Sequence, residues 1–72
     1  MVTAEPDIFL DKLNDEAVRV QPRSVLGMLW LQTHFDDENW ELLSIGAVGL
    51  NTYDAINLSQ DASQSGLYVL FP

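Results

Sequence analysis

One short segment of this 72-residue chain gathers side chains that could bind a metal ion. Its imidazole and carboxylate groups are common ligands of divalent cations. They fall close together in the sequence, at His34, Asp36, Asp37, Glu38 and Glu41. Their spacing differs from that of a calcium-binding EF-hand loop, and no second carboxylate cluster completes a coordination shell. A plainer interpretation is that the acids stabilise the N-terminus of a helix, so we expect no metal site.

The groups of a hydrolytic active site are also missing. A catalytic triad requires a nucleophile, a base and an orienting acid. The chain has no cysteine, His34 is its single histidine, and no serine lies in a glycine-flanked nucleophile elbow. A chain of this length also rarely folds a concavity that could enclose a substrate. We therefore expect no enzymatic activity and no catalytic residues.

Two further features could bind an anion. Residues 46–49 superficially resemble a glycine-rich phosphate loop, but they lack its lysine and follow no convincing strand. We interpret them as an interhelical turn and expect no cofactor. Arg19 and Arg23 flank Gln21 and Pro22 and could together bind an anionic ligand. We favour the alternative, in which the two guanidinium groups pair with carboxylates of the chain itself.

The charge distribution restricts the partners that the chain can have. Three Lys or Arg residues stand against eleven Asp or Glu residues, for a net charge of −8, and no Lys or Arg follows Arg23. Such a surface repels phosphates and gains no affinity from counterion release. Anionic membranes likewise attract cations rather than carboxylates. We expect no direct contact with nucleic acid and none with a membrane.

Length and composition predict one small domain over residues 1–72. Hydrophobic residues make up 47% of the chain, but a chain this short buries only a modest core. The absence of cysteine excludes disulfides and fits a reducing compartment. No basic leader with an apolar run opens the chain, and no apolar stretch is long enough to span a bilayer. We predict a cytoplasmic protein.

The first half of the chain is predicted to form two helices. Apolar residues recur at helical spacing from Phe9, which predicts an amphipathic helix over residues 6–17. Ser24 is a suitable N-cap for a second helix, which is apolar almost all round. We expect that helix, with Trp30, to form the centre of the core. Gly27 inside it indicates close packing against another backbone.

A third helix is predicted to begin after Asp36. With Asp36 as N-cap, Phe35 and Trp40 have the spacing of a hydrophobic staple. Gly46 is the predicted terminator of this helix.

A fourth helix is predicted to begin at Asn51 or Thr52 and to end at Gly66 in a Schellman motif. The uncharged segment 67–71 then has the composition of a strand, and the only comparable segment is 18–21. We therefore expect a mainly α fold of three to four short helices, to which a minor two-stranded pair of these segments could be added. Otherwise the tail packs on the helices or pairs with another chain.

Protein binding is the function that these exclusions favour. We predict a small acidic regulator or adaptor that binds another protein with a basic or mixed apolar and basic surface, through a helix face or the C-terminal apolar segment. Aromatic side chains with acidic neighbours are the predicted contact residues: Trp40, Tyr53, Tyr68, Phe71, Asp36, Asp37, Glu38 and Glu41.

Two alternatives remain open at this point. An acidic nucleic-acid mimic would occupy a basic groove on a DNA- or RNA-binding protein, and its affinity would fall steeply with salt. A self-assembling structural protein would form dimers through residues 67–71.

Overall fold

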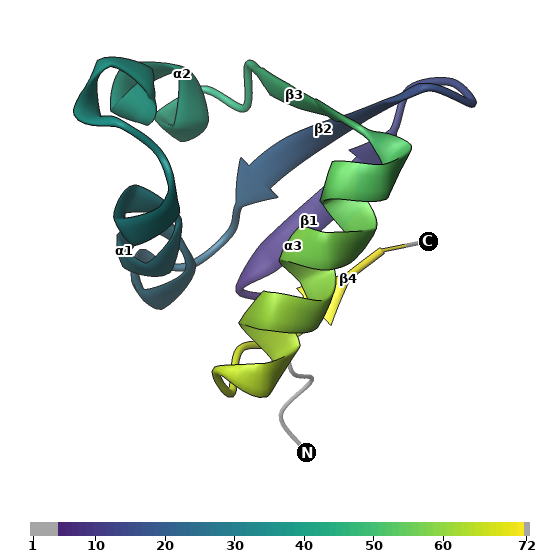
Figure 1. The fold of residues 1–72 in the computed structure, drawn as a ribbon. Coiled ribbons are helices and arrows are strands. Elements are labelled where there is room, and N and C mark those ends of the chain that lie inside the picture. The colour runs from purple at the N-terminus through teal and green to yellow at the C-terminus, as the bar shows by residue number, and fades with distance from the viewer. Residues whose placement is uncertain (1–4, 72) are drawn as a thin grey trace.

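The computed structural model describes residues 5–71 and shows a four-stranded mixed sheet in the order β3-β2-β1-β4 (Figure 1). The central pair, β1 (Ile8–Lys12) and β2 (Ala17–Pro22), is antiparallel. β3 (Val48–Asn51) continues the sheet antiparallel to β2, and β4 (Val69–Leu70) lies parallel to β1 on the other side. The sheet therefore joins segments from both ends of the chain.

Helices occupy the connections between strands. α1 (Val25–His34) follows β2, and a 3₁₀ turn, η1 (Asp37–Asn39), leads directly into the short α2 (Trp40–Ser44). α3 (Thr52–Gln64) connects β3 to the segment that ends in β4. The fold is thus α/β, and the prediction of a mainly helical domain is wrong.

The predicted helix over residues 6–17 is instead β1, a turn and the start of β2. Ile8 and Leu10 alternate with half-buried neighbours, and both are fully buried. Val20, which lies opposite Leu10, and Val18, which lies opposite Lys12, are fully buried as well. This alternation has the period of a strand and outweighs the weaker helical spacing that begins at Phe9. Nonlocal pairing decides the outcome, because the two strands bury one shared face.

The turn between β1 and β2 carries a local signal of its own. The side-chain oxygen of Asn14 accepts a hydrogen bond from the backbone N–H of Glu16 at 2.8 Å, as in an Asx turn. The backbone N–H of Leu13 donates to the carbonyl of Ala17 at 2.9 Å and closes the hairpin. Leu13, which the helical pattern places on an apolar face, is exposed.

The predicted pairing of segment 18–21 with segment 67–71 is also wrong. Both segments contain strands, but each pairs with β1, so that β1 lies between them. The opposite edge of β2 pairs with β3, part of which was predicted to be an interhelical turn. Sequence patterns indicate that a segment is extended, whereas strand order depends on contacts between distant segments.

One face of the sheet forms the core together with the helices. The helices and the segment before β4 contribute five buried hydrophobic residues to this core: Leu31, Leu43, Ala55, Ala62 and Leu67. α1 contributes only Gly27 and Leu31 as buried residues, and Trp30 is half-buried against the core. The expectation that this helix forms the centre of the core is therefore wrong, because that centre is the β1–β2 pair.

Several predicted helix ends are confirmed. Ser24 and Asn51 are the N-caps of α1 and α3, and their side chains accept backbone hydrogen bonds from Gly27 and Asp54. Gly46 and Gly66 have positive φ angles of 70° and 89° and follow the C-caps of α2 and α3. The backbone bonds around each have the Schellman pattern. The predicted third helix is shorter than expected, since its first turn is the 3₁₀ turn η1 and Asp36 makes no side-chain capping bond.

Candidate partner-binding surface

The outer side of α1 exposes three large aliphatic side chains. Val25, Leu26 and Leu29 are 77%, 57% and 55% exposed. They lie on the opposite side of the helix from Gly27 and Leu31, because helical residues separated by three or four positions share a face. A helix that is apolar all round and packs on one side only must leave its other side in contact with water.

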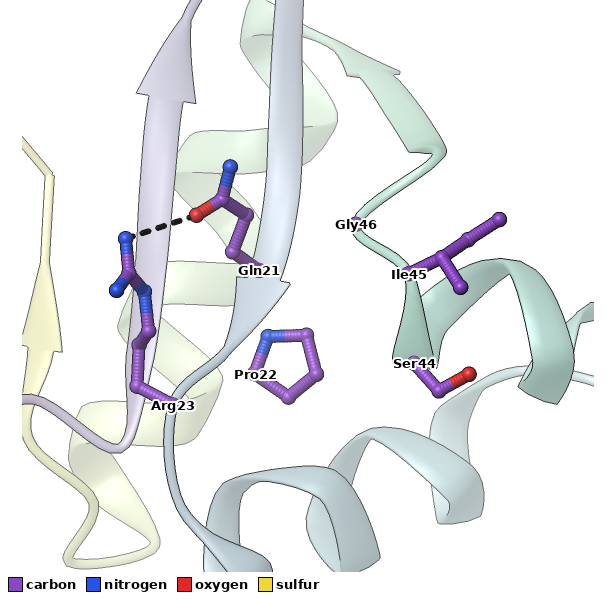
Figure 2. Close-up of a pocket in the computed structure, with 6 residues that line it drawn as sticks. All are labelled: Gln21, Pro22, Arg23, Ser44, Ile45 and Gly46. Carbon is purple, nitrogen blue, oxygen red and sulfur yellow. Dashed lines mark hydrogen bonds between the residues drawn. The ribbon is translucent and has the colours of Figure 1, made fainter.

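A shallow groove borders this surface where β2 ends, beside the start of α1 and the end of α2. Two adjoining hollows of about 310 Å³ each share Pro22, Arg23 and Ser44 as lining residues. The hollow nearer α1 also includes Val25 and Met28. The other is drawn in Figure 2 and is lined further by Gln21, Ile45 and Gly46.

Apolar side chains border this groove at the start of α1 and directly after α2. Ile45, beyond the end of α2, is 71% exposed, and Val25 borders the groove on α1. In Figure 2 the charged end of Arg23 turns toward Gln21 rather than toward Ser44. We call Val25, Leu26, Leu29 and Ile45 the apolar surface.

The predicted acidic residues lie in the stretch that follows α1, at the cap of η1, in η1 and in the first turn of α2. Asp36, Asp37, Glu38 and Glu41 are all exposed. Trp40 is the first residue of α2, and its indole N–H donates to the carbonyl of Phe35, the C-cap of α1, at 3.1 Å. Within residues 5–71, no three His, Cys, Asp or Glu side chains are grouped so that they could hold a metal ion.

The other predicted contact residues lie on different elements. Tyr53 is exposed in the first turn of α3, and Tyr68 is exposed just before β4. Phe71, after β4, is half-buried against the core. The structure therefore keeps Trp40 beside the four acids and places the three other aromatic residues on α3 and around β4.

Sequence reasoning missed the apolar surface because it placed every apolar residue of α1 in the core. One available signal was the spacing of Val25 and Leu29, which puts both side chains opposite Gly27. A second was chain length, since a domain this small cannot surround a whole helix.

A hydrogen-bond network around Asp7 fixes the start of α1 relative to the sheet. The backbone N–H of Tyr68 and the hydroxyl of Ser24 donate to its carboxylate at 2.9 and 2.7 Å. These bonds, that of Tyr68 first, hold the pKa of Asp7 below its ordinary value of 3.8, although desolvation opposes them. Gly27 is needed here, because a Cβ at this position would clash with the backbone oxygen of Asp7. This confirms the predicted close approach of another backbone.

The fold and surface together define a small acidic α/β domain whose first helix displays aliphatic side chains beside an acidic segment. Residues 9–71 match the family described as "Cyanobacterial NIF11-like domain", and the chain belongs to that family. No curated protein and no solved structure matches the chain. The longest helix that the structure describes has 13 residues, and none has the length and hydropathy of a bilayer-spanning helix.

Proposed function

We propose that this chain is a protein-binding module, a small regulator or adaptor that docks on another protein through the apolar surface of α1 and α2. The observation that carries the proposal is the exposure of Val25, Leu26 and Leu29 on successive turns of one helix. Clustered aliphatic side chains in contact with water are typical of protein interaction sites. Burying the exposed part of one such side chain would contribute about 1–2 kcal/mol to association.

Charge indicates the kind of partner. The acidic segment at the C-terminal end of α1 contributes Asp36, Asp37, Glu38 and Glu41, and no Lys or Arg follows Arg23 in the chain. A partner with an apolar patch and a basic rim would complement both features. Such a rim would mainly accelerate association and orient the complex, while the apolar contact would supply most of the affinity.

The test is a quantitative comparison of captured proteins. Tagged wild-type chain and a Leu26→Ser/Leu29→Ser variant are used to enrich binding proteins from the native lysate, at low and at high salt. We expect at least one protein to be enriched by the wild type and lost with the variant. Its binding should weaken only moderately at high salt, because exposed charges are screened and apolar contacts are not.

The matched control is Leu13→Ser/Ile56→Ser, which removes two exposed aliphatic side chains from the β1–β2 turn and from α3 instead of α1. This variant should retain the captured protein, and circular dichroism should show that all three chains are folded. If both variants capture the same proteins as the wild type, the proposal is wrong.

The two alternatives would give different results in the same experiment. A nucleic-acid mimic would lose its partner steeply with salt and keep it in the α1 variant. Self-assembly would appear in analytical ultracentrifugation as a dimer that depends on protein concentration. Deleting residues 67–72 is not a suitable test of self-assembly, because it removes β4 and the buried Leu67. Tyr68→Ser is preferable, since that side chain is exposed.

A further inference from the structure

The second face of the sheet carries a different set of side chains. The strand register aligns Leu70, Phe9 and Gln21 in one row across β4, β1 and β2. Asp11 and Arg19 form a neighbouring pair on β1 and β2. None of these five residues is fully buried, whereas Ile8, Leu10, Val18 and Val20 on the first face are.

The two arginines that sequence analysis considered together behave differently here. Arg19 donates to the carboxylate of Asp11 at 2.8 Å, as expected for pairing within the chain. Arg23 has no carboxylate within ion-pair distance among residues 5–71, so the prediction of internal pairing is wrong for it. Its Nη2 group donates to the side-chain oxygen of Gln21 at 2.9 Å, as Figure 2 shows.

The Arg23 guanidinium is nevertheless held in place. Its Cζ lies over the ring of Phe9, 5.3 Å from the centroid, in a cation–π arrangement. The ring on one side and the bond to Gln21 restrict the side chain, so that less conformational entropy is lost when its remaining N–H groups bind an acceptor. An open hollow of about 350 Å³ adjoins it, lined by Glu5, Pro6, Phe9, Arg23 and Leu70.

We propose that Arg23 and this hollow form a receptor for a carboxylate side chain of a peptide segment, with a neighbouring apolar side chain of that segment against Phe9 and Leu70. Arginine binds carboxylates through paired N–H groups, and apolar walls strengthen the interaction by excluding water. The receptor shares Arg23 with the groove beside the apolar surface, but its other lining residues are different. The proposal does not depend on the function proposed above.

A carboxylate fits this site better than a phosphate. Among residues 5–71, Arg23 is the only cation that lines the hollow, and Glu5 lines it as well. The net charge of −8 would repel a doubly charged phosphate more strongly than a singly charged carboxylate. Arg19 cannot supply a second positive charge unless its ion pair with Asp11 is broken.

The test is an NMR titration of isotope-labelled protein with two synthetic probes, N-acetyl leucyl-glutamyl-leucine amide and its glutaminyl counterpart. The glutamyl peptide should shift the Arg23 side-chain N–H signal and the signals of Phe9, Gln21 and Leu70. We expect it to bind at least about tenfold more tightly than the glutaminyl peptide, because only a carboxylate makes charge-assisted bonds. Inorganic phosphate should bind more weakly than the glutamyl peptide.

Variants separate a specific site from general charge attraction. Arg23→Gln should abolish the preference for the glutamyl peptide, and Arg23→Lys should reduce it because lysine lacks the planar fork. Lys12→Gln changes net charge by the same amount at the end of β1, away from the lining residues of the hollow, and should leave the preference intact. Equal binding of the two peptides, stronger binding of phosphate, or equal losses in the Arg23→Gln and Lys12→Gln variants would each overturn the proposal.

Discussion

The two longest helices of this domain use apolar side chains in opposite ways. α1 is rich in large aliphatic residues, yet only Gly27 and Leu31 are buried in it. α3 is mostly polar and buries two alanines, Ala55 and Ala62, against the same core. Small residues allow α3 to lie close to its neighbours, whereas much of the apolar surface of α1 faces water. Hydrophobic content alone therefore does not identify the helix that stabilises a small fold.

The largest change in stability should come from a substitution on the buried side of α1, and the same substitution on its exposed side should have little effect. Leu31→Ala removes a fully buried side chain and should lower the free energy of unfolding by about 2–5 kcal/mol, through lost burial and a residual cavity. Leu29→Ala, on the exposed side, should cost less than about 1 kcal/mol. Urea denaturation followed by circular dichroism measures both values. Equal losses would mean that the two sides of the helix do not differ in burial.

The second-largest change in stability is expected where the start of α1 packs against the backbone at Asp7. Helix propensity alone predicts that Gly27→Ala stabilises the domain by about 1 kcal/mol. The clash of the added Cβ with the backbone oxygen of Asp7 should reverse that sign and cost about 1–3 kcal/mol. Gly49→Ala is the matched control, because its Cβ would meet Val18 at an ordinary 3.9 Å. A stabilised Gly27→Ala variant would show that α1 does not approach β1 so closely.

A smaller loss of stability is expected when the N-cap of α3 is removed. Asn51→Ala removes the side-chain oxygen that accepts the Asp54 N–H at 2.8 Å and should cost about 1 kcal/mol. The equivalent change in α1, Ser24→Ala, should cost more than Asn51→Ala, because Ser24 also donates to Asp7 at 2.7 Å. Thermal denaturation of the two variants side by side gives the ranking. The reverse order would argue against the Asp7 network.

The smallest effect at neutral pH concerns the Asp7 carboxylate. Because its pKa is lower in the folded chain than its ordinary 3.8, the unfolded chain binds the proton more readily as pH falls. The stability contributed by ionised Asp7 is therefore complete above that ordinary value and is lost as pH falls through the folded pKa. In Asp7→Asn this component should be absent. Urea midpoints at about pH 7 and about pH 3 should thus differ less for the variant than for the wild type, once both are folded. An unchanged difference would exclude Asp7 as the cause.

Local signals in the sequence determined much of the framework. The N-caps at Ser24 and Asn51, and the terminators Gly46 and Gly66, were predictable because each acts through backbone atoms a few residues away. The close approach at Gly27 was predictable for a similar reason, since a helix rarely retains glycine without a steric cause. The acidic segment at residues 36–41 was also evident before any fold was known.

Tertiary structure alone decided the strands, their order and the exposed surfaces. Segment 8–12 forms a strand because Val18, Val20 and Val69 lie beside it, and helical spacing within residues 6–17 carries no information about those neighbours. The exposure of Leu29 and the position of Arg23 over Phe9 likewise depend on which faces the sheet and helices cover. Caps and turns depend on neighbouring residues, whereas burial depends on how distant segments pack around a shared core, and that packing determines which side chains remain available to a partner.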